Sequence, residues 1–89
     1  MMYQMKITFE DPKELPKVSV FVAASDHTAI DHGVRNGKEL YDELGCGVLV
    51  RVFRYDRFLE LGEDGSVTSP ELHTNILRRF WDTTTEGKE

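Results

Sequence analysis

Residues 2–9, "MYQMKITF", alternate strictly between apolar and polar side chains. A period of two residues predicts a strand with one buried face. A second strand is predicted at 17–24, "KVSVFVAA". Its apolar side chains lie on both faces, with Val18, Val20 and Val22 on one and Phe21 and Ala23 on the other. Because both faces are apolar, we expect this strand in the interior of the sheet and not at its edge.

Residues 26–44 follow the helical period, and the residues at both ends are typical of helix termini. Ser25 is a good N-cap, and Asp26 places a negative charge in the first turn. Gly45 supplies a left-handed stop. The apolar face of this helix contains Gly33 and Gly37. Glycine inside a helix costs about 1 kcal/mol relative to alanine, so we expect these positions to bring the helix backbone close to the sheet.

A third strand is predicted at 47–55, "GVLVRVFRY", and a hairpin at 57–69 with its turn at "GEDG". A second helix is predicted from Pro70 to about Asp82, because Ser69 is a suitable cap and proline suits the first helical position. Its expected apolar stripe consists of Leu72, Ile76 and Phe80.

The element order β-β-α-β-β-(β)-α predicts a small α+β domain. We expect four or five strands and two helices, and if the first strand lies between the second and the third, the sheet is mainly antiparallel. The domain is expected to cover residues 1–82. Residues 83–89, "TTTEGKE", are expected to form a polar and flexible tail.

The chain has 89 residues, a net charge of −5 and a single cysteine, Cys46, so no intrachain disulfide is expected. The longest apolar run, 20–24, is far shorter than a membrane span. The N-terminal residues lack the apolar stretch of a signal peptide. These features predict a cytoplasmic protein without membrane contact, and the acidic balance argues against binding of nucleic acid.

The segment "ASDHTAIDHG" contains two Asp-His pairs and raises the alternative of a metal or hydrolytic site at His27 and Asp31. His27 and His32 differ by about 140° around a helix and cannot bind one ion together. His27 and Asp31 do share a face, but one histidine and one carboxylate are fewer ligands than zinc needs. Asp31 with Arg35 is explained as an i,i+4 ion pair. We therefore predict no catalytic residues, no metal and no cofactor.

Arginine and aromatic residues alternate in "RVFRYDR", which places Arg51, Phe53, Tyr55 and Arg57 on one face of a strand. Such a face can stack unpaired bases or form a protein interface. If the second helix covers this face instead, Phe53 belongs to the core. Trp81 at the end of that helix is either an interface residue or a residue that closes the core.

The run "VFVAASDHTAIDHGV…LGCGVLVRV" resembles a strand–helix–strand unit common among small phage and prophage proteins. The resemblance identifies no particular family, but it implies an accessory protein that binds and modulates a host protein. We predict a non-enzymatic interaction module whose partner is another protein or a second copy of the chain. The expected binding residues are Arg51, Tyr55, Arg57, Arg78 and Trp81. The alternative is a single-stranded nucleic-acid binder that uses the arginine and aromatic face of the third strand.

Overall fold

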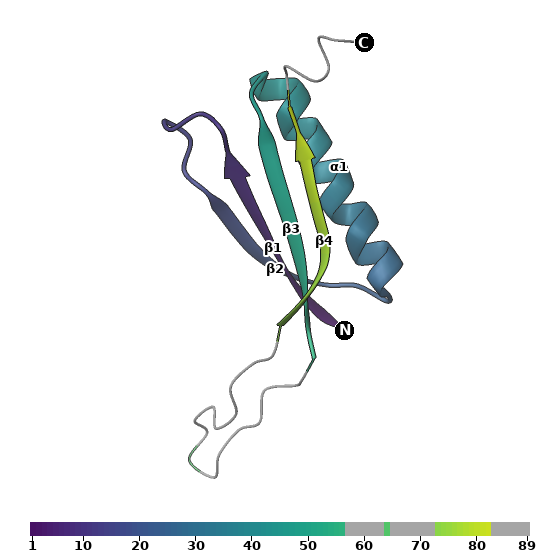
Figure 1. Ribbon diagram of the computed structural model, residues 1–89. Helices are drawn as coiled ribbons and strands as arrows, with labels where there is room; N and C mark the ends of the chain where they lie inside the picture. Colours follow the sequence, from purple (N-terminus) through teal and green to yellow (C-terminus); the bar gives the residue numbers. More distant parts are fainter. Residues whose placement is uncertain (57–63, 65–72, 83–89) are drawn as a thin grey trace.

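The computed structural model describes residues 1–56, 64 and 73–82. In these residues one helix packs on one face of a four-stranded antiparallel sheet (Figure 1). The elements in chain order are β1 (Met2–Phe9), β2 (Lys17–Val22), α1 (Asp26–Leu44), β3 (Val48–Tyr55) and β4 (His73–Trp81). The predicted α+β class is confirmed, as are the positions of β1, α1 and β3.

The strands lie in the order β2-β1-β3-β4, and every neighbouring pair is antiparallel. β1 therefore lies between β2 and β3, the arrangement for which a mainly antiparallel sheet was expected. Because β2 and β3 are both antiparallel to β1, they run parallel to each other. α1 makes the crossover between them (Figure 1).

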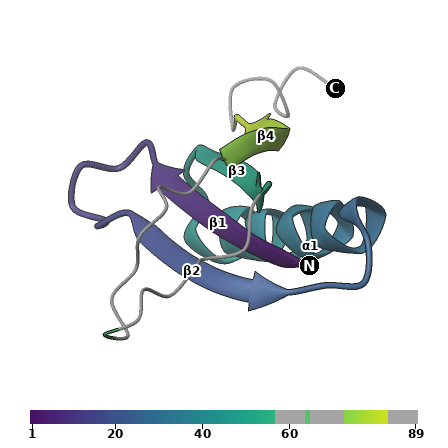
Figure 2. The ribbon, with the colours of Figure 1, turned by 90° about the horizontal axis from the view of Figure 1, so that it is seen from below.

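The core lies between α1 and the face of the sheet that the helix covers (Figure 2). The sheet contributes alternate residues of its two central strands: Tyr3, Met5, Ile7, Val48, Val50 and Val52. The helix contributes Ala29 and Tyr41 with the two glycines between them, Gly33 and Gly37. α1 packs mainly over β3 and β4 and much less over β1.

The two ends of α1 form as the sequence predicts. The Thr28 backbone N–H donates to Ser25 Oγ at 3.3 Å, which makes Ser25 the N-cap. Gly45 is left-handed with φ of 69°, and its N–H donates to the Tyr41 carbonyl at 2.9 Å. A residue with a side chain would be strained at this φ, so glycine ends the helix here.

Gly33 and Gly37 let the helix backbone approach the sheet. A Cβ on Gly33 would lie 2.6 Å from Val52 Cγ2. A Cβ on Gly37 would lie 2.4 Å from Trp81 Cζ3 and 2.5 Å from Val50 Cγ2. These distances are shorter than carbon atoms in contact allow, so the predicted close approach of helix and sheet is confirmed.

The predicted second helix is wrong, because residues His73–Trp81 form strand β4. β3 has buried valines and would have only one strand neighbour without β4. The β3–β4 ladder supplies the second neighbour, and backbone pairing of this kind overrides a weak local helix preference.

A bulge in β4 explains why its sequence does not alternate like a strand. Val52 pairs with Leu77 while Phe53 pairs with Asn75, so Ile76 is an extra residue. An extra residue of this kind interrupts the two-residue alternation of side chains along a strand. The interruption puts apolar residues four positions apart at Ile76 and Phe80, which produced the apparent helical stripe.

The expectation that β2 is an interior strand is not met among the described strands, because β2 lies at the edge of the sheet that they form. Val18, Val20 and Val22, which suggested burial, are exposed. Several other predictions lie outside the described residues: the 57–69 hairpin apart from Asp64, a fifth strand, and the 83–89 tail. In the described part of the chain, no helix combines the length and the apolarity needed to cross a membrane.

Replacement of Gly37 by alanine tests the helix–sheet approach. Overpacking costs about 1–3 kcal/mol, whereas the helix propensity of alanine returns at most about 1 kcal/mol. We therefore expect Gly37→Ala to lower the free energy of unfolding measured by urea denaturation. Lys38→Ala, at an exposed position of the same helix, should change it by less than about 0.5 kcal/mol. A Gly37→Ala protein as stable as the wild type would contradict the close approach.

Candidate functional site

The sheet face opposite α1, here called the open face, is not covered by any helix among the described residues. Side chains that alternate with the core residues point to it. They are Met2, Gln4, Lys6 and Thr8 from β1; Val18, Val20 and Val22 from β2; Leu49, Arg51, Phe53 and Tyr55 from β3; and His73, Asn75, Arg78 and Phe80 from β4. None of these strand residues is acidic, although the chain has a net charge of −5.

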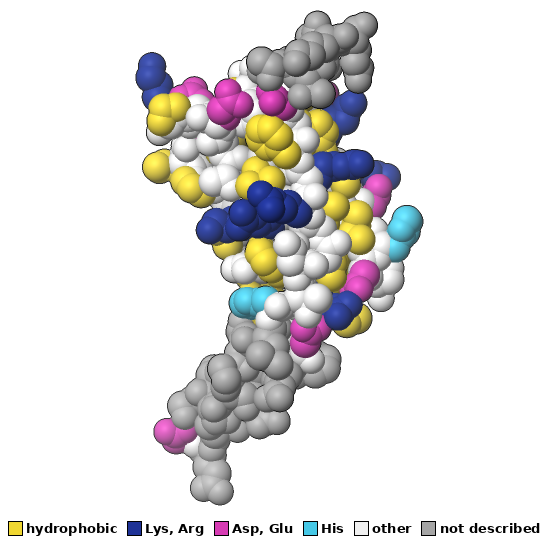
Figure 3. Space-filling view, viewed as in Figure 1, with side chains coloured by type: hydrophobic (Ala, Val, Ile, Leu, Met, Phe, Trp, Pro, Cys, Tyr) yellow, Lys and Arg dark blue, Asp and Glu magenta, His cyan; other side chains and the backbone are white. Residues whose placement is uncertain are grey.

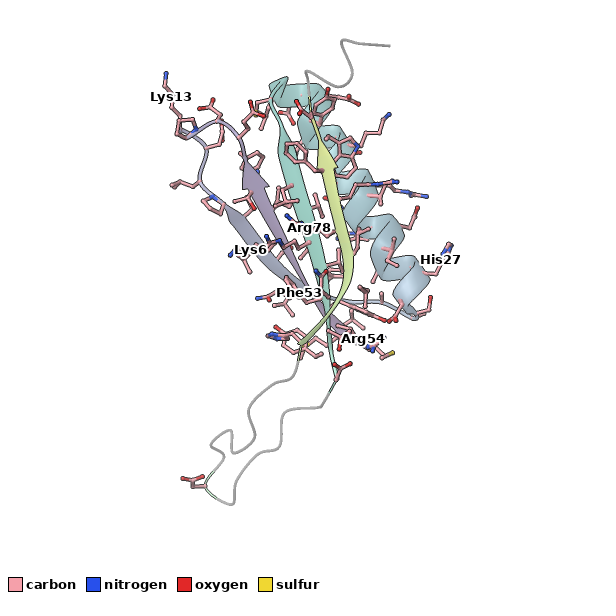
Figure 4. All side chains as sticks on the ribbon, in the orientation of Figure 1. Lys6, Lys13, His27, Phe53, Arg54 and Arg78 are labelled. Carbon is pink, nitrogen blue, oxygen red and sulfur yellow. The ribbon has the colours of Figure 1, made fainter. Side chains whose placement is uncertain are left out.

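Three basic side chains cross the middle of the open face in one line. Lys6 pairs with Arg51, and Arg51 pairs with Arg78, so they occupy directly opposed positions on β1, β3 and β4. We call these residues the basic row. Figure 3 shows basic side chains gathered across the middle of this face, and Figure 4 shows Lys6 and Arg78 there.

The basic row is an unfavourable arrangement for the isolated chain. Adjacent strands are about 4.8 Å apart, and like charges directly opposite each other destabilise a sheet. Within the described residues, the ion pairs involve Arg35 and Arg54 but none of the three basic-row residues. No carboxylate of the described residues therefore balances the charges of the row.

Arg51 at the centre of the row has an unsatisfied hydrogen-bond donor. Its Nε is buried and has no partner within the part of the chain that the structure describes. Nearly all buried donors in folded proteins are hydrogen-bonded. Arg51 Nε is therefore an exception among the described residues.

Apolar and aromatic residues lie on both sides of the basic row. On one side Leu49 pairs with Phe80, whose side chain is 53% exposed. On the other side lie Phe53 and the pair Tyr55 and His73, whose rings are edge-to-face with centroids 4.4 Å apart. Hydrophobic side chains are visible above and below the basic ones in Figure 3. The open face thus combines a positively charged centre with apolar margins.

The structure brings three of the predicted binding residues, Arg51, Tyr55 and Arg78, onto the open face. Trp81 is on the opposite face of the sheet, where its ring packs against Gly37 at the margin of the core. Trp81 therefore does not share a surface with the other three. Arg57 lies outside the described residues.

Lys6, His73 and Phe80 belong to the open face but were not predicted as site residues. For Lys6 the sequence does give a signal, since it lies on the polar face of the first strand. Its alignment with Arg51 depends on strand register, which no local pattern reveals. His73 and Phe80 were missed because β4 was predicted as a helix.

A separate polar cluster ties the start of α1 to the sheet. Tyr3 Oη donates to Asp26 Oδ1 at 2.8 Å, and Arg54 pairs with Asp26 Oδ2. Arg54 Nε also donates to Asp56 Oδ1 at 2.9 Å, and the Thr74 hydroxyl donates to Asp56 Oδ2. These contacts join β1, the start of α1, the end of β3 and the start of β4. Every side chain in the cluster has a hydrogen-bond partner, as is typical of a cluster that stabilises the fold.

The partners in this cluster shift three pKa values. Burial, followed by the hydrogen bond to Asp26, raises the pKa of Tyr3. The hydrogen bonds to Asp56 and then Asp26 raise the pKa of Arg54. The hydrogen bond from Thr74, followed by that from Arg54, lowers the pKa of Asp56. Each shift favours the protonation state that holds the cluster together at neutral pH.

The Asp-His pairs do not converge on one site. His27 is exposed and points away from the sheet (Figure 4), whereas the His32 ring lies 4.4 Å from the ring of Phe21. Asp31 Oδ2 pairs with Arg35 Nε at 3.0 Å, which confirms the predicted i,i+4 ion pair. Across the described ranges, no group of three or more His, Cys, Asp or Glu side chains is placed to hold a metal ion. His27 and Asp31 thus have no third ligand there.

Comparisons of the chain with protein-family models, with curated proteins and with solved structures each gave no match.

The cost of the basic row can be measured at Arg78. Because Arg78→Gln removes one of the opposed charges, we expect the free energy of unfolding to rise by about 0.2–1 kcal/mol at low ionic strength. The gain should shrink in high salt, which screens exposed charges. Arg35→Gln is the matched control, since it removes an arginine with an ionic partner and should lower stability slightly. A loss of stability in Arg78→Gln would show that the row is not repulsive.

Acid unfolding tests the cluster at Asp56. Because its pKa is lowered in the folded state, ionised Asp56 stabilises the fold above its unfolded pKa of about 3.9. That contribution is lost as the pH falls through the folded-state pKa. Asp56→Asn should therefore be less stable than the wild type at pH 7 and should lose less stability between about pH 5 and pH 2. Thr74→Val should shift the profile part of the way, since it removes one donor. Superimposable acid profiles of wild type and Asp56→Asn would contradict this role.

Proposed function

We propose that the chain is a non-enzymatic interaction module that binds another protein through the open face. The observation that carries the proposal is the basic row, which lies on a face that bears no carboxylate among its strand residues. The arrangement is unfavourable for the free protein. Carboxylates of a partner would relieve the repulsion by pairing with the charged groups of the row.

The apolar margins indicate what else the partner presents. Val18, Val20 and Val22 form an exposed aliphatic column along β2, and Phe80 is exposed at the far edge. Apolar residues around a few charged groups are typical of protein interfaces. The proposed partner surface is therefore acidic at its centre and apolar around it.

A single-stranded nucleic acid is the second candidate, and the aromatic residues beside the basic row favour it. Phosphates would bind the basic residues, and bases would stack on Phe53, Tyr55 or Phe80. Against it stand the net charge of −5 and the engagement of Tyr55 and Phe53 with the ring of His73. The aliphatic column on β2 also offers no aromatic surface to a base. We therefore favour the protein partner.

The proposal also includes a setting: a phage- or prophage-type accessory protein that modulates a host protein in the cytoplasm. Its support is the resemblance of the strand–helix–strand segment, which corresponds to β2, α1 and β3.

Affinity capture from host lysate, with mass spectrometry, tests the proposed function. We expect the wild type to enrich a specific protein and Arg51→Ala/Arg78→Ala to lose it, since each charged hydrogen bond contributes about 1.5–3 kcal/mol. This corresponds to a loss in affinity of at least about tenfold for each arginine. Arg35→Ala, on the exposed surface of α1, should retain the partner.

Two results would count against this proposal. Equal recovery of the protein by the double variant would exclude the open face as its binding site. Salt-sensitive binding of short single-stranded oligonucleotides, measured by fluorescence polarisation and abolished in the double variant, would favour the second candidate instead.

A further inference from the structure

The two edge strands of the sheet, β2 and β4, differ in how they are protected against pairing with another chain. β4 contains the bulge at Ile76 and carries Arg78 and Arg79. Bulges and charged residues are the usual devices that keep an edge strand from pairing. In β2 the register with β1 is continuous, and no residue from 18 to 22 is charged. β4 is therefore a protected edge, and β2 is an unprotected one.

The composition of β2 is that of an interior strand. Its three valines are 57%, 56% and 78% exposed at Val18, Val20 and Val22. Apolar residues on both faces of a strand are typical of a position between two neighbours. Among the described strands β2 has one neighbour, β1, and its outer edge is unpaired. A strand of another molecule could pair with this edge.

The hydrogen-bond pattern of β1 and β2 shows which backbone groups are available for that neighbour. Met1 and Ala23 exchange both of their backbone hydrogen bonds, each at 3.1 Å. In an antiparallel ladder such pairs recur at every second residue, so Phe21 and Ser19 also bond to β1. The N–H and C=O groups of the intervening residues, Val18, Val20 and Val22, then point outward from the free edge.

We propose that β2 pairs with β2 of a second copy of the chain, in antiparallel orientation and centred on Val20. In this register Val20 bonds to Val20 of the other copy, and Val18 bonds to Val22, in both directions. All outward-pointing backbone groups of the three valines are used. The contact is two-fold symmetric and closed, and it joins two four-stranded sheets into one continuous sheet.

Charge and space both permit this pairing. Opposed residues are valines on the open face and Phe21 with Ser19 on the other face, so no like charges meet. α1 packs mainly over β3 and β4, at the other side of the sheet, and leaves the β2 edge accessible. A face-to-face dimer would instead bring the two basic rows together. Edge pairing keeps them apart and places both open faces on the same side of the joined sheet.

Oligomeric state tests the proposal through one substitution. In Val20→Lys two lysines would meet at the symmetric centre, while pairing with β1 is retained because the backbone of Val20 faces away from it. Leu15→Lys is the matched control, since Leu15 is 79% exposed but precedes β2. By sedimentation velocity, we expect the wild type and Leu15→Lys to dimerise with increasing concentration. Val20→Lys should raise the dimer dissociation constant at least about tenfold.

Disulfide trapping tests the register. Cα atoms of a hydrogen-bonded antiparallel pair are about 5.5 Å apart, within the range of a disulfide. In a Cys46→Ser background, Val20→Cys should cross-link two copies under mild oxidation, whereas Val18→Cys should not, since it lies opposite Val22. Circular dichroism confirms that each variant is folded.

Three results would overturn the proposal. They are a wild type that stays monomeric at all concentrations, a Val20→Lys protein that dimerises like the wild type, and equal cross-linking at positions 18 and 20. This pairing uses the β2 backbone, so its failure would leave the proposed function of the open face unaffected. Loss of partner capture in Arg51→Ala/Arg78→Ala would likewise leave the dimer unchanged.

Discussion

The close approach of α1 to the sheet is the constraint on which the rest of the structure depends. Two glycines one helical turn apart, Gly33 and Gly37, allow the helix backbone to rest on the side chains of β3 and β4. In this contact the helix covers one face of the sheet, where the two glycines lie against Val50, Val52 and Trp81. Because the described chain contains a single helix, the other face has no comparable cover. The same packing that makes the core thus determines which side of the sheet remains accessible.

The polar cluster around Asp26 fixes how the helix and the sheet are aligned along their length. Asp26 begins α1 and bonds both to Tyr3 of β1 and to Arg54 of β3. Tyr3 and Arg54 are themselves opposed in the β1–β3 ladder. Slipping this ladder by one residue would turn the core side chains to the other face and would also separate Tyr3 from Arg54. The register that aligns Lys6 with Arg51 on the open face is therefore held by contacts on the covered face.

The parts of the fold that local patterns could predict are those whose residues obey one period throughout. β1 alternates without a break, and α1 carries recognisable caps at Ser25 and Gly45. β4 could not be predicted in this way, because the bulge at Ile76 interrupts its alternation. In addition, the preceding Ser69 and Pro70 are residues typical of a helix start. The edge position of β2 was missed because its side chains match those of a buried strand. Of the candidate site, Arg51 and Tyr55 follow from alternation within one strand, whereas the basic row requires a register between strands far apart in sequence.

The placement of β1 has a consequence for how the chain folds. β1 is made first, yet it lies at the centre of the sheet and pairs with β3, for example Met5 with Val52. Only the local β1–β2 ladder can form before the helix and β3 have been synthesised. Sheets dominated by such distant pairings fold slowly, on the scale of about milliseconds to seconds. The central β1–β3 ladder can therefore close only after both α1 and β3 have been synthesised.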